Sequence, residues 1–263
     1  MALIGSIIGD IIGSQYEFPS MRPKNLDWMH CELFTNKCEY TDDTVMSIAT
    51  KYALDHYKGN FAKAYHEFGR KYPHCGYGDK FFHWIRTHNA APYGSWGNGS
   101  AMRVSYIGDV VQDLDNVVNL SKHSALCTHN SEAGIRGAIV TAGMVAMGNR
   151  HYTKADMYGI ANKFYKDNLY DCSQSLDEIR KEYVWNEICD DTVPVAIRCF
   201  LESDDYESCI RNCLSLPCDM DTMCCIAGGI AEAYYGTTGL DNEKILKQYL
   251  DTYLYDCIKD VIK

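Results

Sequence analysis

The sequence has no excess of positive charge. Its 25 Lys and Arg residues are outnumbered by 35 Asp and Glu residues, so that the net charge is −10 over 263 residues. A protein that grips nucleic acid through a broad face needs clustered positive charge, and this composition argues against such a face. An anionic ligand is still compatible with it, because a bound cation would reverse the local charge.

The sequence also has no uninterrupted apolar run long enough to span a membrane. Segment 1–18 is apolar but contains Asp10 and Glu17, and no basic stretch precedes it, so we expect neither a signal peptide nor a membrane helix. Cysteine is abundant, with 13 residues, but the count is odd and no spacing repeats. We expect reduced thiols in a cytoplasmic protein, where Cys224 and Cys225 serve as small apolar residues of a helix.

Strand signals are nearly absent, whereas apolar residues recur at helical spacing along most of the chain. Segment 73–100 is the exception, because its Pro and Gly residues predict a long loop and its many aromatic residues argue against disorder. No linker, repeat or low-complexity tract divides the chain. We therefore predict a single compact all-α domain over residues 1–263. The predicted helices cover 3–18, 44–56, 60–70, 101–106, 113–124, 131–148, 154–166, 193–203, 205–214, 221–235 and 243–260.

The first predicted helix carries a glycine every four residues. Gly5, Gly9 and Gly13 fall on one flank, so another backbone could pack closely against them. Asp10 and Glu17 are seven residues apart, which predicts that they share a polar edge two turns long.

Clustered oxygen side chains open the helix that follows residue 41. In the stretch TDDT at 41–44, Thr41 can cap the helix, and Asp42 and Asp43 meet the positive end of its dipole. One cap needs only one side chain, however, and this stretch offers two carboxylates and two hydroxyls. An ordinary helix start and a ligand site both remain open for this stretch alone.

A similar stretch, DMDT at 219–222, opens a later apolar helix with Asp219, Asp221 and Thr222. If the two helix starts meet in space, their carboxylates and hydroxyls form an oxygen-ligand set for hard cations such as Mg²⁺ or Mn²⁺. Asp10 or Glu17 could complete this set, and two such ions would balance the charge of four Asp residues. We therefore predict a dinuclear metal site at helix N-termini.

A third acidic stretch, CDDTVPVAI at 189–197, is interpreted as an ordinary helix start. Thr192 is the predicted cap, and Pro194 follows it in the first turn, where proline is tolerated.

The stretch PYGSWGNGSAMR at 92–103 is rich in glycine. Backbone N–H groups of such a loop can approach a phosphate closely, and Trp96 could stack on a base, although a plain turn also explains the glycines. His129, in CTHNSEAGIRGA at 127–138, is either a structural residue of a helix start or a donor to a phosphate. The candidate substrate-binding residues are Gly94, Ser95, Trp96, Gly97, Asn98, Gly99 and His129.

In these motifs and in their order, the chain resembles the ADP-ribosylglycohydrolase family, the group that includes dinitrogenase reductase-activating glycohydrolase and the ADP-ribosyl-acceptor hydrolases. The resemblance covers most of the chain and is carried by five stretches. These are GSIIGDIIGSQYE at 5–17, TDDT at 41–44, SWGNGSAMR at 95–103, THNSEA at 128–133, and DMDT with AGGIAEAYYG at 219–236.

The resemblance implies an all-α hydrolase with two Mg²⁺ or Mn²⁺ ions as cofactors. Its implied metal ligands are Thr41, Asp42, Asp43, Asp219, Asp221 and Thr222. Glu17 resembles the glutamate beside the metals and the scissile bond, and Glu17, Asp42 and Asp219 are the candidates for proton transfer. The 94–99 loop resembles the pyrophosphate-binding loop, with Trp96 near the base.

Two departures from the family pattern stand out. The family usually has Gly-Gly-Asp-Ser-Asp-Thr where this chain has Pro217, Cys218, Asp219, Met220, Asp221 and Thr222. Asn130-Ser131 stands where His-Pro is common. Neither departure removes an implied ligand.

The resemblance implies hydrolysis of a glycosidic bond at C1″ of ADP-ribose, with free ADP-ribose as product. Arginine is the first expected acceptor, followed by serine and small O-linked conjugates. A non-catalytic ADP-ribose-binding pseudoenzyme and a metal-dependent phosphohydrolase are the alternatives. We expect ADP-ribose and ADP-ribosylated substrates as partners, no membrane association, and a monomer.

Overall fold

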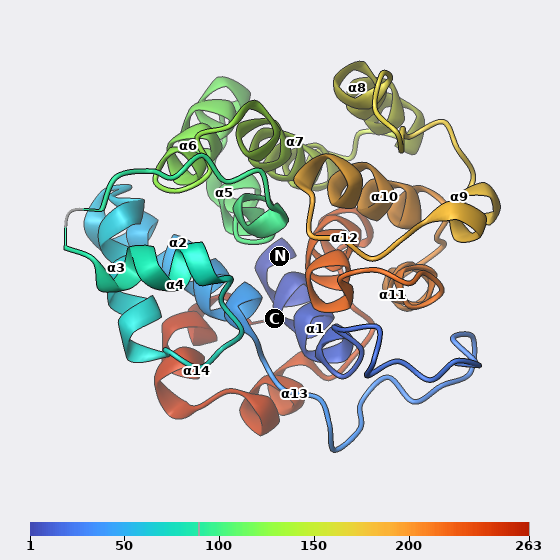
Figure 1. Ribbon diagram of the computed structural model, residues 1–263, viewed down its shortest axis with the longest axis horizontal. Helices are drawn as coiled ribbons and strands as arrows, with labels where there is room; N and C mark the ends of the chain where they lie inside the picture. The colour runs from blue at the N-terminus through green and yellow to red at the C-terminus, as the bar shows by residue number, and fades with distance from the viewer. Residues whose placement is uncertain (89, 263) are drawn as a thin grey trace.

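Two helices with glycine at their contact, α1 (Ala2–Ser14) and α12 (Met220–Tyr235), pack against each other at the centre of the molecule (Figure 1). The structure is a computed structural model that describes residues 1–88 and 90–262. A Cβ atom on Gly5 would lie 2.6 Å from the Gly228 carbonyl oxygen, and one on Gly13 would lie 2.6 Å from the Asp221 Cα. The predicted close approach of another backbone to the first helix is confirmed, and that backbone belongs to α12.

The other helices surround this central pair (Figure 1). Among the described residues there are no β-strands, and one isolated bridge joins Gly97 to Ile188. The prediction of a compact all-α domain is confirmed. The surrounding helices are α2 (Asp42–Tyr57), α3 (Phe61–Lys71), α4 (Asp79–Arg86), η1 (Asn98–Ser100), α5 (Ser105–Val110), α6 (Leu114–Leu126), α7 (Glu132–Asn149), α8 (Lys154–Tyr165), α9 (Leu176–Glu182), α10 (Cys189–Leu201), α11 (Tyr206–Leu214), α13 (Asn242–Tyr249), α14 (Thr252–Ile258) and η2 (Lys259–Val261).

The cysteines are free thiols. All 13 of them lie in the described part of the chain, and none is paired in a disulfide. Cys224 and Cys225 are fully buried in α12, as predicted for small apolar residues.

Helix α1 ends at Ser14 and not at residue 18 as predicted. The Ser14 hydroxyl and the Gln15 side-chain amide both donate to carbonyl oxygens of the last turn, so they satisfy the acceptors that a longer helix would use. Glu17 therefore lies in the turn that follows, and it does not share a helical edge with Asp10.

The predicted helix over 243–260 is divided into α13 and α14. Leu250 has extended backbone angles between them, and the Asp251 carboxylate accepts hydrogen bonds from the Tyr253 and Leu254 amides at 2.8 and 3.0 Å. An aspartate in this position starts a new helix, and this explains the break.

Two short helices, α4 and α9, were not predicted. Helix α4 lies within the segment 73–100 that was expected to be a loop, and it buries Phe81, Trp84 and Ile85. Helix α9 begins with a capping box in which Ser175 and Glu178 satisfy each other's amides. That S-x-x-E pattern was the available sequence signal.

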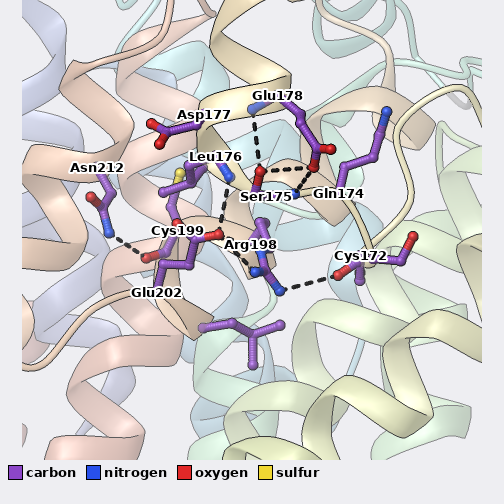
Figure 2. Close-up of polar contacts among 12 residues, drawn as sticks. Cys172, Gln174, Ser175, Leu176, Asp177, Glu178, Arg198, Cys199, Glu202 and Asn212 are labelled. Atoms are coloured by element: carbon purple, nitrogen blue, oxygen red, sulfur yellow. Dashed lines mark hydrogen bonds and ion pairs between the residues drawn. The ribbon is translucent and has the colours of Figure 1, made fainter.

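Polar contacts hold α9 and the preceding loop against α10 (Figure 2). The Leu176 amide donates to Glu202 Oε1 at 3.0 Å, and Arg198 Nε donates to the same oxygen at 2.8 Å. Arg198 also donates to the Cys172 carbonyl oxygen at 3.4 Å. These contacts anchor the start of α9 and the loop before it to the C-terminal end of α10.

Gly9→Ala should lower the free energy of unfolding by roughly 1–3 kcal/mol or more, because the added methyl group would overlap the Cys224 carbonyl. The matched control is Gly143→Ala in α7, where no atom lies within 4 Å of an added Cβ, and this change should stabilise the helix by up to ~1 kcal/mol. Urea denaturation measures both variants. Equal stability of the two would contradict the close packing of α1 on α12.

Candidate metal and substrate site

A cavity of about 320 Å³ opens where the N-terminal ends of α2 and α12 meet. Both acidic stretches and the glycine-rich loop reach it, although they are far apart in the sequence. Thr41 and Gly94 are the two predicted site residues that do not line the cavity. The predicted residues that do line it are Glu17, Asp42, Asp43, Ser95, Trp96, Gly97, Asn98, Gly99, His129, Asp219, Asp221 and Thr222.

Asp10 of α1 holds the first turn of α2 in place. Its carboxylate accepts hydrogen bonds from the Thr41 and Thr44 amides at 3.0 and 3.1 Å, and from the Thr41 hydroxyl at 2.7 Å. Thr41 Oγ1 in turn accepts from the Asp43 amide at 3.3 Å, so the predicted cap is confirmed. The same helix that packs against α12 therefore also fixes the start of α2.

Three buried carboxylates, those of Asp10, Asp43 and Asp221, converge beside the cavity. One oxygen from each lies within 4.8 Å of the others. The Thr222 hydroxyl donates to Asp43 Oδ2 at 3.1 Å, while Asp43 Oδ1 is buried with no hydrogen-bond partner among the residues that the structure describes. Carboxylates this close repel one another, so the arrangement fits a divalent cation that would offset their charge and bind the unpartnered oxygen.

Asp219 is held by the glycine-rich loop. It is the N-cap residue of α12, and its Oδ2 accepts a hydrogen bond from Asn98 Nδ2 at 2.8 Å. Asn98 also donates to the Thr192 hydroxyl at 3.2 Å. The side chain of Asn98 thus connects the loop, α10 and the start of α12 at the acidic end of the cavity.

Burial raises the pKa values of the carboxyl groups in this cluster. Desolvation raises the pKa of Asp10 to about 6 and the pKa of Asp219 to about 7. Desolvation, followed by repulsion from neighbouring carboxylates, raises the pKa values of Asp42, Asp43 and Asp221 well above the ordinary range. Negative charge in the cluster is therefore costly unless a counter-ion is bound.

Glu17 lies in the turn after α1 and lines the cavity. Burial, and then the charges of Asp221, Asp10 and Glu187, raise the pKa of Glu17 to about 8. Its carbonyl oxygen accepts a hydrogen bond from Trp185 Nε1 at 3.0 Å, which fixes the turn. A carboxyl group that keeps its proton near neutral pH can donate it to a leaving group.

The glycine-rich loop uses several of its amides internally. The N–H groups of Gly94, Gly97 and Asn98 donate to oxygen atoms of the protein at 2.7, 3.2 and 2.9 Å. In this conformation these three groups are therefore not free to bind a phosphate. Trp96 is 57% exposed beside the cavity, so its ring is open to a ligand.

Asn130 and Ser131, where the family commonly has His-Pro, attach this loop to the start of α7. Asn130 Oδ1 is the acceptor for the Gly94 amide. The Ser131 hydroxyl donates to the Ser95 carbonyl oxygen at 2.6 Å, and it caps α7 by accepting from the Gly134 amide at 3.1 Å. This departure therefore supports the loop.

The other departure lies behind the carboxylates. Cys218 is 2% exposed, Met220 is fully buried, and the Cys218 thiol contacts Met220 Sδ at 3.7 Å. Neither side chain lines the cavity. Cys218 and Met220, which replace one of the usual glycines and the serine of the family, thus fill the core.

The stretch at 189–197 lies outside the carboxylate cluster, at a helix start as predicted, but the prediction that Thr192 caps this helix is wrong. Helix α10 begins three residues before Thr192, so Thr192 does not cap it. The carboxylate of Asp190 binds Arg136 in a bidentate salt bridge. Asn168 donates to the Asp190 carbonyl oxygen at 3.3 Å, the acceptor that loses its usual partner because Pro194 has no N–H.

Several cavity residues were not predicted. Glu187 lines the cavity from a loop that carries no motif, and the bridge between Gly97 and Ile188 brings it there. Arg103 lines the cavity from the end of the glycine-rich motif. Arg103 could have been found from its place in that motif, whereas no sequence pattern pointed to Glu187.

Carboxylates, a glycine-rich loop and Glu17, whose pKa burial raises, line one cavity of this all-α fold, and this arrangement suits a hydrolase that acts on glycosyl bonds. The chain belongs to the ADP-ribosylglycohydrolase family, whose model matches residues 1–263. The predicted family, and the prediction of an enzyme that hydrolyses glycosyl bonds, are thereby confirmed.

Individual relatives agree with this family. The chain is 27% identical to ADP-ribosylhydrolase ARH3 of Homo sapiens, over 89% of this chain and 84% of the relative, and 26% identical to ADP-ribosylhydrolase ARH3 of Mus musculus, over 89% and 82%. A solved structure described as an ADP-ribosylglycohydrolase-related protein complex superposes with a TM-score of 0.71 at 18% identity, over 97% of this chain and 92% of that chain. That structure shows the shared fold.

Within residues 1–88 and 90–262, no helix has both the length and the apolar character needed to cross a membrane.

The melting temperature of the metal-free protein should fall as the pH rises from about 5 to about 7. Unfolded Asp side chains lose their protons near pH 4, whereas burial keeps Asp10 protonated to about pH 6 and Asp219 to about pH 7, so the unfolded state binds fewer protons in this interval. His66 and His129, whose pKa values burial lowers, act in the opposite direction but contribute two protons against several carboxyl groups. Thermal melts in EDTA measure the slope, and excess Mg²⁺ should reduce it. A pH-independent melting temperature in EDTA would contradict the electrostatic account.

Proposed function

We propose that this protein removes ADP-ribose from an acceptor by hydrolysing the glycosidic bond at C1″, which releases free ADP-ribose. The observation that carries the proposal is the convergence of Asp10, Asp43 and Asp221 beside a cavity that Glu17 also lines. Membership of the ADP-ribosylglycohydrolase family and the names of the relatives support the same reaction. The free thiols suit the reducing cytoplasm, which is the location we propose.

Two Mg²⁺ or Mn²⁺ ions are the proposed cofactors. When bound, they supply positive charge that offsets the buried carboxylates and holds the ribose hydroxyls. Asp10 supports this site from α1 while it holds the start of α2. The proposed ligands are Thr41, Asp42, Asp43, Asp219, Asp221 and Thr222.

Proton transfer is assigned to Glu17. Hydrolysis adds a hydroxyl group from water to C1″ and a proton to the acceptor that leaves, and a carboxyl group with a pKa of about 8 can carry that proton. Asp42 lines the cavity and Asp219 is held by Asn98, so both remain close enough to the ligand site to share this role. Trp96, which is open to solvent, stacks on the base of ADP-ribose.

The charges near Glu17 favour arginine as the acceptor, ahead of serine and small O-linked conjugates. Glu17 and Glu187 both line the cavity, and the Glu187 charge is one cause of the raised pKa of Glu17. Phe18 and Trp185 lie beside them with ring centroids 6.0 Å apart. The Glu187 carboxylate together with these aromatic rings suits a guanidinium group, which forms ion pairs and stacks on rings.

Release of ADP-ribose from a conjugate should require a divalent cation and Asp221. Asp221→Asn keeps the shape of the side chain but removes a proposed ligand, and it should lower turnover by ~100-fold or more and remove the rise in melting temperature that Mg²⁺ causes. Asp191→Asn, in the acidic stretch outside the cluster, is the matched control and should leave both readouts unchanged.

Product release is measured with arginine-, serine- and acetyl-linked ADP-ribose, with and without EDTA. Full activity in EDTA, or of the Asp221→Asn variant, would contradict the proposed metal site. Binding of ADP-ribose without turnover of any conjugate would point to a pseudoenzyme.

Glu187→Gln tests the acceptor. Loss of one carboxylate should reduce kcat/KM for arginine-linked ADP-ribose by ~10-fold and leave kcat/KM for an O-linked conjugate within about twofold, because an O-linked acceptor carries no guanidinium to bind. The ratio of the two values is the measurement. An equal effect on both conjugates would contradict a role of Glu187 in acceptor choice.

A further inference from the structure

His129 is buried between the glycine-rich loop and a cationic side chain. It is 4% exposed and lines the cavity. A Cβ atom on Gly99 would lie 3.3 Å from His129 Nε2, so the loop passes directly over this nitrogen. Among the described residues, Nε2 has no hydrogen-bond partner, whereas Nδ1 lies 2.7 Å from Thr128 Oγ1.

Thr128 connects His129 to Arg103. Arg103 is 1% exposed, and its Nη2 donates to Thr128 Oγ1 at 3.0 Å and to the Ser124 carbonyl oxygen at 2.9 Å. The Arg103 guanidinium also lies over the ring of Tyr65, 4.2 Å from its centroid. These contacts fix the guanidinium, which has no way to accept a hydrogen bond from Thr128.

The direction of the hydrogen bonds follows from this chain of contacts. Because the guanidinium only donates, Thr128 Oγ1 accepts from Arg103, and its own hydrogen is left to donate. The acceptor within reach among the described residues is His129 Nδ1. His129 then carries its proton on Nε2, where it faces the loop and the cavity.

We propose that Thr128, oriented by Arg103, is a positioning residue that sets the tautomer of His129, so that Nε2–H donates to an oxygen of the bound ligand. The ligand part of this inference rests on the proposed function, and the tautomer part does not. Burial and the charge of Arg103 also lower the pKa of His129, which keeps the ring neutral. A neutral ring with a fixed donor binds an oxygen without adding a second buried cation beside Arg103.

The tautomer is measured by ¹⁵N NMR of the full-length protein with ¹⁵N-labelled histidine and Mg²⁺. The signals of His129 are assigned by their loss in His129→Gln. In the wild type, Nδ1 should have the shift of an unprotonated nitrogen and Nε2 that of a protonated nitrogen. Thr128→Ser, which keeps the hydroxyl, should retain this pattern, whereas Thr128→Val, which has nearly the same shape, should lose it.

Binding of ADP-ribose by calorimetry is the second readout. Thr128→Val should raise the Kd by ~10-fold, which is the usual effect of losing one oriented hydrogen bond, and Thr128→Ser should stay close to wild type. A protonated Nδ1 in the wild type would overturn the proposal, and so would a Thr128→Val protein with unchanged signals and Kd. If the protein has the predicted tautomer but releases no ADP-ribose, the role of Thr128 in setting the tautomer is supported and the proposed function is overturned.

Discussion

The site depends on the contact between α1 and α12 that glycine makes possible. Without a side chain on Gly13, the backbone of α1 lies against the first turn of α12, which carries Asp221 of the acidic stretch. From the same helix, Asp10 binds the amides that start α2. One helix therefore places both acidic helix starts, and neither cluster has to find the other through a flexible loop.

This arrangement concentrates negative charge where burial makes it unfavourable. The carboxyl groups of Asp42, Asp43 and Asp221 have pKa values far above the ordinary range, and Asp43 keeps one buried oxygen without a partner among the described residues. A protein optimised only for stability would not retain such a cluster. Its retention is the physical argument that the cluster serves a ligand, and the surrounding core of apolar helices supplies the stability that it removes.

The sequence predicted the features that depend on spacing and local chemistry. The glycine flank of α1, the cap at Thr41 and the all-α class follow from such patterns. The meeting of the two acidic stretches was a condition of the metal-site prediction, and the family resemblance implied it. Prediction from the sequence failed where contacts between distant segments determine the structure. The end of α1 depends on where the Ser14 and Gln15 side chains bind, and the place of Glu187 depends on a bridge between segments far apart in sequence. Gly94 looked like a phosphate ligand, but Asn130 takes its amide, which no local pattern reveals.

The order of helices along the chain has a consequence for synthesis. The partner of the first helix is α12, which lies more than two hundred residues downstream. Contacts over such separations form slowly, because the entropy cost of closing a long loop comes before the contacts contribute any stabilising free energy. While the chain grows from its N-terminus, the glycine flank of α1 is therefore left without its partner until residues 220–235 have been made. The candidate site, which needs both helices, is therefore among the last parts of the protein to assemble.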